Sequence, residues 1–399
     1  MFASLFHVGS LPRGTHFNGK GTRRQSSRPA AALPRAVIIV AMWRRSACRG
    51  PLRAGWSPRF ASASTSASDA ASHAEWGLKI GLEVHAQIAT ASKLFSAAST
   101  AFGADPNSQA AFVDAALPGT LPVLNEGCVR MAVATALSLN CELHRKSVFE
   151  RKHYFYADLP HGYQITQQAS PIATGGSVEL SLPDGEQLSV ALERIQLEID
   201  TGQSHHDIVP GMTMVDLNRA GNPLMEIVTA PVLPSAAAAA AFVLELQRTL
   251  RHIGACDGNM EQGSMRVDVN VSVAGGERCE VKNLNTVRGV ARAIEYEARR
   301  QHEALESGEA VPSETRRWDN GAGKTVGMRS KEDAWDYRFM PEPDLPPLLL
   351  PAALVEEVRE GLGDSLAAVR ARLRETHGLS AYDIGVLEAR IPPCCAFLK

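Results

Sequence analysis

Apolar and polar residues alternate along seven segments of the chain, which is the pattern of half-buried β-strands. In the first segment, residues 78–88, Leu82 and Val84 fall on one face of the strand, and Glu83 and His85 fall on the other. The other six predicted strands cover residues 148–156, 188–199, 212–217, 224–229, 265–273 and 278–283. Strands therefore dominate the predicted secondary structure.

Three longer segments carry apolar residues at helical spacing, over residues 126–139, 236–253 and 286–306. The second has the clearest ends, because Ser235 is a favoured N-cap and Gly254 is a favoured stop. The predicted helices are inserted between groups of strands and do not alternate with single strands. This arrangement predicts the α+β class with a largely antiparallel sheet.

Shifts in composition divide the chain into four parts. Residues 1–70 form a leader, and residues 76–347 form the main domain, which the Pro-rich residues 341–347 close. Residues 348–390 carry apolar residues at helical spacing, which predicts the beginning of a helical domain. Residues 391–399 have neither periodicity nor helix caps. We therefore expect a C-terminal truncation.

The leader has the composition of an organellar transit peptide. Residues 1–68 contain eleven Lys and Arg residues, many Ser and Ala residues and no acidic residue. The apolar run 36–42 is too short to span a bilayer, and the arginines around it make a secretory signal the weaker alternative. We expect a mitochondrial location, with the plastid as the alternative, and no membrane insertion. Met42 is an alternative start.

The charge of the remaining chain argues against nucleic-acid binding through a broadly basic surface. The whole sequence has 41 basic and 43 acidic residues, so the part that follows the basic leader is acidic. Any RNA contact must then come from local basic patches. The seven cysteines include no C-x-x-C pair, which supports neither a zinc knuckle nor a disulfide framework.

Glutamate and histidine residues on predicted strands are candidates for a divalent-cation site. Glu83 and His85 project from one face of their strand, although a plain hydrogen-bonded pair is an equal alternative. Glu226 is a lone acid in an apolar run, and a buried carboxylate needs a partner or a metal. Glu198 lies on the polar face of its strand, where a solvated side chain is the usual alternative. Together the four side chains offer oxygen-rich ligation that suits Mg²⁺ or Mn²⁺.

Two further clusters are candidates for binding phosphate. Arg266 and Asp268 follow a Gly263–Ser264 turn whose N–H groups could face an anion, although an ordinary turn fits equally well. Arg329 and Arg338 lie in a basic segment interleaved with aromatic residues, which favours nucleotide phosphates or a tRNA end. Salt-bridged surface strands are the alternative there. The sequence contains no P-loop and no Rossmann glycine motif.

Several motifs together resemble a known family, the B subunits of the tRNA-dependent amidotransferases that convert Glu-tRNA(Gln) into Gln-tRNA(Gln). The likeness covers roughly residues 76–390. The motifs that carry it are Ile80–His85, Leu117–Asn125, Arg151–Pro160, Asp216–Gly221, Val281–Asn285 and Asp336–Pro343. The resemblance implies an α+β cradle related to the catalytic domains of glutamine synthetase and the guanido kinases.

The resemblance also implies a reaction with defined partners. ATP and Mg²⁺ would support phosphorylation of the tRNA-borne glutamate, and ammonia that the A subunit releases from glutamine would displace the phosphate. The implied partners are the A subunit, the C subunit and Glu-tRNA(Gln). The residues that match the family's metal positions are Glu83, His85, Glu198 and Glu226. Lys152 and Asp268 match polar positions that we expect to be catalytic, and Arg266, Arg329 and Arg338 are the expected nucleotide ligands.

Two other functions stay open at this point. A truncated chain could be a scaffold that binds the A and C subunits without catalysis. A free-standing ligase that amidates a small carboxylate, as glutamine synthetase does, is the third interpretation, and the motifs fit it less well. The choice between Glu-tRNA(Gln) and Asp-tRNA(Asn) is not decided by the sequence.

Overall fold

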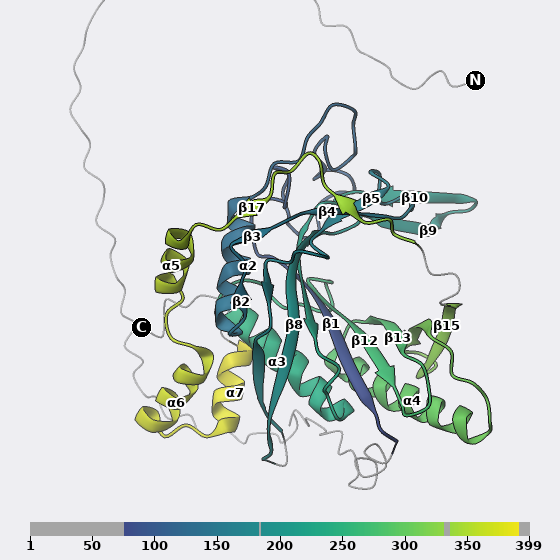
Figure 1. The fold of residues 1–399 in the computed structure, drawn as a ribbon, viewed down its shortest axis with the longest axis vertical. Coiled ribbons are helices and arrows are strands. Elements are labelled where there is room, and N and C mark those ends of the chain that lie inside the picture. The colour runs from purple at the N-terminus through teal and green to yellow at the C-terminus, as the bar shows by residue number, and fades with distance from the viewer. Residues whose placement is uncertain (1–75, 183–184, 331–335, 391–399) are drawn as a thin grey trace, which may run out of the picture. The chain divides into compact units, whose positions relative to one another are not determined.

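The computed structural model describes residues 76–182, 185–330 and 336–390. The predicted transit peptide and the tail, residues 391–399, lie outside these ranges. Within them, ten strands form the main sheet (Figure 1). These strands are β1 (Lys79–Gln87), β2 (Glu142–Leu143), β6 (Ala173–Thr174), β7 (Ser177–Ser181), β8 (Gln187–Ile199), β11 (Pro223–Thr229), β12 (Met265–Ser272), β13 (Cys279–Leu284), β14 (Glu314–Asp319) and β15 (Lys324–Ser330).

The order across this sheet is β15-β14-β13-β12-β1-β11-β8-β6-β2, and β7 pairs with β8. Its strands pair antiparallel except for β13 and β14, which are parallel and are joined by a helix. A parallel neighbour needs such a crossover because the chain must return to the same end of the sheet. The predicted α+β class with a largely antiparallel sheet is therefore confirmed.

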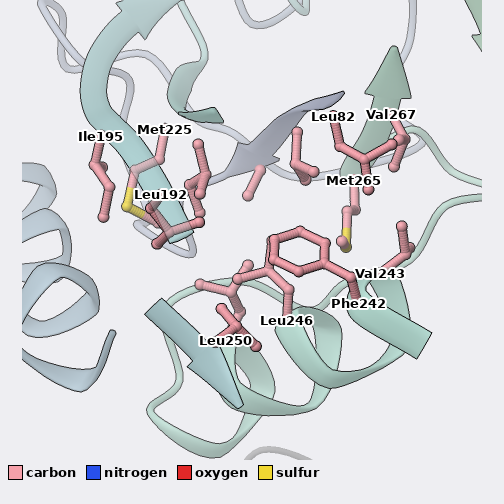
Figure 2. Close-up of a cluster of buried hydrophobic side chains, with 14 of the residues drawn as sticks. Leu82, Leu192, Ile195, Met225, Phe242, Val243, Leu246, Leu250, Met265 and Val267 are labelled. Atoms are coloured by element: carbon pink, nitrogen blue, oxygen red, sulfur yellow. The ribbon is translucent and has the colours of Figure 1, made fainter. Parts of the chain in front are cut away.

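Two long helices cover the apolar face of the sheet. They are α3 (Ala236–His252) and α4 (Val287–Glu306). Figure 2 shows Phe242, Leu246 and Leu250 of α3 pointing at Leu82 and Met225 of the sheet, all of them buried. Each such large apolar side chain contributes about 1.5–3 kcal/mol when it is removed from water. The same alternation places four polar residues on the opposite face of the sheet, the polar face: Glu83, His85, Glu198 and Glu226.

Side-chain hydrogen bonds cap the starts of the long helices and confirm the predicted N-cap Ser235. The Ser235 hydroxyl accepts a hydrogen bond from the Ala238 amide at 3.1 Å, and the Thr286 hydroxyl accepts one from Gly289 at 3.0 Å. Gly254 follows the end of α3 with a φ of 71°. The third predicted helix is α2 (Glu126–Ser138), which Asn125 caps through the amide of Gly127.

A small sheet lies over part of the polar face. It consists of β4 (Glu150–His153), β5 (Tyr163–Thr166) and β16 (Met340–Pro341). Gln164 of β5 donates a hydrogen bond to the backbone oxygen of Ile199 at 2.7 Å, which holds β5 against the end of β8. The remaining short pairs are β3 (Lys146–Ser147) with β17 (Leu348–Leu349) and β9 (Gln203–Val209) with β10 (Met212–Asp216).

Two predicted elements differ from the structure. The strand expected over 148–156 is limited to β4, and after it Tyr154 keeps a backbone hydrogen bond to Gly162 while its hydroxyl donates to Gln164. The helical segment expected after residue 352 is divided into three helices. The first of them ends before Gly363, whose φ of 69° is incompatible with a continuing helix. They are α5 (Ala352–Gly361), α6 (Leu366–His377) and α7 (Ala381–Arg390). Within the described ranges, no helix is long and apolar enough to cross a membrane.

Candidate cation site

Three adjacent strands bring two carboxylates and one imidazole together on the polar face. In the ladder, His85 of β1 stands directly opposite Glu226 of β11, and Glu198 of β8 lies opposite Leu224. The Nε2 atom of His85 lies 3.2 Å from Oε1 of Glu198 and 3.7 Å from Oε2 of Glu226. Both glutamates are buried. The solvated alternative for Glu198 is therefore wrong.

Neutral side chains complete the surroundings of the two carboxylates. Thr166 of β5 donates to Oε2 of Glu198 at 3.2 Å, and the Gln196 amide donates to Oε2 of Glu226 at 2.9 Å. The nearest guanidinium is that of Arg194, whose Nη2 is 3.8 Å from Glu226. The small sheet explains the burial of Glu198, because β5 covers the polar face at the point where Glu198 emerges.

The pKa values of all three residues in this cluster are shifted from their usual values. Burial and the neighbouring charge of Glu198 raise the pKa of Glu226 to about 7. Burial would also raise the pKa of Glu198, but the hydrogen bond and charge of His85 lower it to about 2. Burial alone would lower the pKa of His85, but the hydrogen bond and charge of Glu198, followed by the charge of Glu226, raise it to about 9. The raised pKa of His85 thus reflects the negative charge of the two carboxylates beside it.

The donor set fits a divalent cation. His85, Glu198 and Glu226 each offer one ligand atom, and these atoms lie within 4.8 Å of one another. Two carboxylate oxygens and one imidazole nitrogen suit Mg²⁺ or Mn²⁺ better than a metal that prefers thiolates. The plain hydrogen-bonded pair considered for Glu83 and His85 is not formed, since His85 bonds to Glu198 instead.

Glu83, the fourth predicted ligand, lies outside this group of three. Its Oε1 accepts a hydrogen bond from the Asn270 amide at 2.9 Å, although its charge still contributes to the raised pKa of Glu226. The Oδ1 atom of Asn270 is buried and accepts no hydrogen bond from the described part of the chain. Asn270 was not predicted as a site residue. It lies two residues after Asp268 on the same face of its strand, and this spacing could have indicated it.

Lys152 and Asp268, the predicted catalytic residues, border the cluster from two sides. The Nζ atom of Lys152 lies 4.8 Å from the centroid of the Tyr337 ring, and its charge lowers the pKa of both Glu198 and Glu226. Asp268 stands opposite Glu83 in the ladder and accepts a hydrogen bond from Lys282 at 2.7 Å. Both positions remain predictions of catalytic residues.

Of the three predicted nucleotide-binding arginines, the structure describes the side chains of Arg266 and Arg338. Arg266 stands opposite His85 in the ladder, and its Nη2 lies 2.9 Å from Asp200, so this residue borders the cluster. Arg338 is exposed and lies 3.6 Å from Asp336. The side chain of Arg329 is outside the described part of the structure, as is Trp335.

The turn before Arg266 is an ordinary one. The amide of Gly263 donates to the oxygen of Met260 at 3.2 Å, and that of Ser264 donates to the oxygen of Asn259 at 3.0 Å. Neither N–H group is therefore available to an anion, and the phosphate-binding interpretation of this turn is wrong.

Sequence reasoning missed the neutral residues that hold the carboxylates. Gln196 shares the polar face of β8 with Glu198, and this common face was a usable signal. Thr166 carried no comparable signal, because its strand is short and its contact with Glu198 crosses from another sheet.

Fold and site together define an α+β domain with a buried candidate cation site, as in a cation-dependent catalytic domain. Residues 78–356 match the GatB/GatE catalytic domain family. The chain is 52% identical over 320 residues to the B subunit of the aspartyl/glutamyl-tRNA(Asn/Gln) amidotransferase of Xanthobacter autotrophicus, an alignment that covers 79% of this chain and 64% of that protein. The chain belongs to the GatB/GatE catalytic domain family.

Two further relatives with the same description give a consistent result. The proteins of Methylorubrum populi and Rhodopseudomonas palustris are each 52% identical, over 320 and 318 residues. These alignments cover 79% and 78% of this chain, and 65% and 64% of the relatives. The chain thus spans slightly less than two thirds of the length of the relatives it matches.

Proposed function

We propose that this chain is the B subunit of a tRNA-dependent amidotransferase that converts Glu-tRNA(Gln) into Gln-tRNA(Gln) in mitochondrial translation. Its partners would be an A subunit that releases ammonia from glutamine, and a C subunit. The observation that carries this proposal is the buried cluster of His85, Glu198 and Glu226, which lies within the residues that match the family. We also assign the domain to the cradle type shared with glutamine synthetase and the guanido kinases. The leader composition supports the location.

ATP and Mg²⁺ are the proposed cofactors. When bound, they would supply the phosphoryl group that turns the glutamyl carboxylate, a poor acyl donor, into one with a good leaving group. His85, Glu198 and Glu226 would hold the cation, with Glu83 beside them. Two partly neutralised carboxylates suit a cation that also takes ligands from substrate phosphates.

The other residues of the cleft would position charge around this reaction. Lys152 would place an ammonium group on the open side of the cluster, where negative charge develops on a transferring phosphoryl group. Arg266 stands opposite His85 in the ladder, and its guanidinium is anchored on the buried carboxylate of Asp200. Asp268, held by Lys282, would keep the neighbouring part of the sheet negative and favour cation binding.

Substitution of one cluster residue in the assembled complex tests this proposal. Glu226→Gln keeps the shape of the side chain and removes one ligand charge. In a complex of this chain with A and C subunits, we expect it to abolish Gln-tRNA formation and to leave glutaminase activity and assembly unchanged. The matched control is Glu142→Gln, the same chemical change at an exposed position of β2, which should leave all three unchanged.

The possible outcomes separate the candidate functions. Normal Gln-tRNA formation by Glu226→Gln would refute the cation assignment. A complex with the unsubstituted chain that assembles and hydrolyses glutamine but forms no Gln-tRNA would favour the scaffold role. ATP hydrolysis stimulated by free glutamate without tRNA would favour the free-standing ligase.

A further inference from the structure

Two aromatic segments, about 180 residues apart in sequence, lie side by side next to the cation site. One follows β4 and contains Tyr154, Phe155 and Tyr156, and the other precedes β16 and contains Tyr337 and Phe339. The backbone amide of His153 donates to the oxygen of Tyr337 at 2.9 Å, and Arg151 pairs with Met340 in the ladder. The junction of the two strands therefore fixes where the two segments meet.

The rings form a connected row. Ring centroids are 5.8 Å apart for Tyr154 and Tyr156, 6.1 Å for Tyr154 and Tyr337, and 6.0 Å for Tyr337 and Phe339, each pair meeting edge to face. We call these four residues the aromatic row. Phe155, between Tyr154 and Tyr156 in sequence, adds a further exposed ring next to it. Edge-to-face contacts hold the four rings in fixed orientations.

The middle of the aromatic row reaches the buried carboxylates, and both of its ends are exposed. Tyr156 and Phe339 at the ends are 55% and 40% exposed, and Phe155, next to Tyr156 in sequence, is 72% exposed. In the middle of the row, the Tyr154 hydroxyl donates to Gln164 at 3.1 Å, and Gln164 in turn donates to the backbone of Ile199, the neighbour of Glu198. Isolated exposed aromatic residues need no explanation, but a connected row whose middle lies beside a candidate active site does.

The charge beside the row is positive. Lys152 lies 4.8 Å from the centre of the Tyr337 ring and 5.9 Å from that of Tyr154. Arg338 is exposed between Tyr337 and Phe339, with Asp336 as its ion-pair partner. Aromatic rings combined with a few cationic groups are the usual means of binding unpaired nucleotides, because every base has a face that can stack.

We propose that the aromatic row stacks the unpaired nucleotides at the 3′ end of a tRNA and so delivers the attached amino acid to the cation site. This inference rests on the proposed function. The substrate carboxylate must reach Glu198 and Glu226 while the tRNA duplex stays outside, so unpaired bases must cover the distance between them. Three exposed rings provide more stacking surface than the single base of one ATP molecule requires.

Fluorescence of a modified RNA hairpin measures the stacking directly. The probe ends in an unpaired CCA sequence with 2-aminopurine as the terminal base, whose emission is quenched when it stacks. With the full chain, we expect quenching that Phe155→Ala and Phe339→Ala reduce, with binding about tenfold weaker for each. Phe339→Trp should restore both signals, since a larger ring also stacks.

The matched control is Phe112→Ala. Phe112 is 71% exposed, nearly the same as Phe155, and lies in a loop outside the aromatic row. Its replacement should change neither quenching nor affinity. Because Phe155 and Phe339 contribute little to the core, circular dichroism should show that all variants remain folded.

Steady-state kinetics of the complete complex separate the two sources of a purine base. The two alanine variants should raise the KM for aminoacyl-tRNA about tenfold and leave the KM for ATP unchanged. A rise in the KM for ATP alone would assign the row to the nucleotide and overturn the inference, as would unchanged fluorescence in both variants. A complex with the unsubstituted chain that forms no Gln-tRNA would refute the proposed function instead.

Discussion

Two buried glutamate clusters in this protein differ in how their charge is balanced. Glu297 of α4 is fully buried, and its carboxylate is 2.6 Å from Nη2 of Arg300 and 3.4 Å from Nε of Arg316. Gln301 and Thr325 donate further hydrogen bonds to it at 2.9 and 2.7 Å. Burial would raise the pKa of Glu297, but the hydrogen bond from Arg300 and these other donors lower it.

The carboxylates of Glu198 and Glu226 have fewer positive groups around them. These two carboxylates share the imidazole of His85 and the guanidinium of Arg194, which lies 3.8 Å from Glu226. The Glu297 site therefore balances two carboxylates, Glu297 and Glu314, with two guanidinium groups, whereas the cluster of Glu198 and Glu226 is short of positive charge. A buried carboxylate that is fully paired stabilises the fold, whereas a buried pair with a charge deficit is suited to bind a cation.

Removal of the balanced carboxylate should have the largest effect on stability. We expect Glu297→Ala to lower the free energy of unfolding by about 3–5 kcal/mol, because it removes the fully buried partner of Arg300 and Arg316 and leaves Glu314 alone to balance their two charges. Urea denaturation monitored by circular dichroism measures this loss. Glu306→Ala on the exposed end of α4, where Glu306 pairs with His302, should cost less than about 1 kcal/mol. Equal losses in the two variants would contradict the distinction.

Removal of a carboxylate from the cation site should instead increase stability. In the protein without metal at pH 8, Glu226→Gln should raise the free energy of unfolding by about 1–3 kcal/mol, because it removes a carboxylate whose pKa is raised to about 7. It should also abolish Mn²⁺ binding, measured by calorimetry. If Glu226→Gln instead lowers the free energy of unfolding, neighbouring positive groups already balance the charge of Glu226, and the prediction is wrong.

The pH dependence of cation binding follows from the two raised pKa values. The folded protein binds the protons of Glu226 and His85 more tightly than the unfolded chain does. Their contribution to stability is therefore present at low pH and is lost as pH rises through about 7 and about 9. Since Mn²⁺ must displace both protons, its affinity should rise with pH, more steeply below pH 7 than between pH 7 and 9.

Titration calorimetry between pH 6 and 8.5 measures this profile. His85→Gln removes the imidazole titration and should flatten the upper part of the curve. An unchanged profile in that variant would show that His85 is not a ligand.

Two threonines provide the finest comparison. Thr325 donates to Glu297 and Thr166 donates to Glu198, and both are buried. Replacement of either by Val should cost about 1–2 kcal/mol of stability, since each removes a hydrogen bond to a charged group. Only Thr166→Val should also weaken Mn²⁺ binding. A change in Mn²⁺ affinity for Thr325→Val would mean that the two clusters are coupled.

The local pattern was enough to predict most elements around the site. The predicted strands 78–88, 188–199 and 224–229 correspond to β1, β8 and β11, because each has one face buried against helices. Alternation also placed Glu83 and His85 on a common face. It could not show that His85 would contact Glu198, since that depends on which strands are neighbours.

The sequence by itself determined the long strands and helices that carry the site, the Ser235 cap, the polar face of the sheet and the family, because these depend on spacing along the chain and on the order of motifs. The tertiary structure decided which polar residues meet. Glu198 is buried because β5 crosses the polar face, Glu83 is held apart by Asn270, and the two aromatic segments meet because β16 pairs with β4. Contacts between strands distant in sequence follow from sheet order, which no local periodicity encodes.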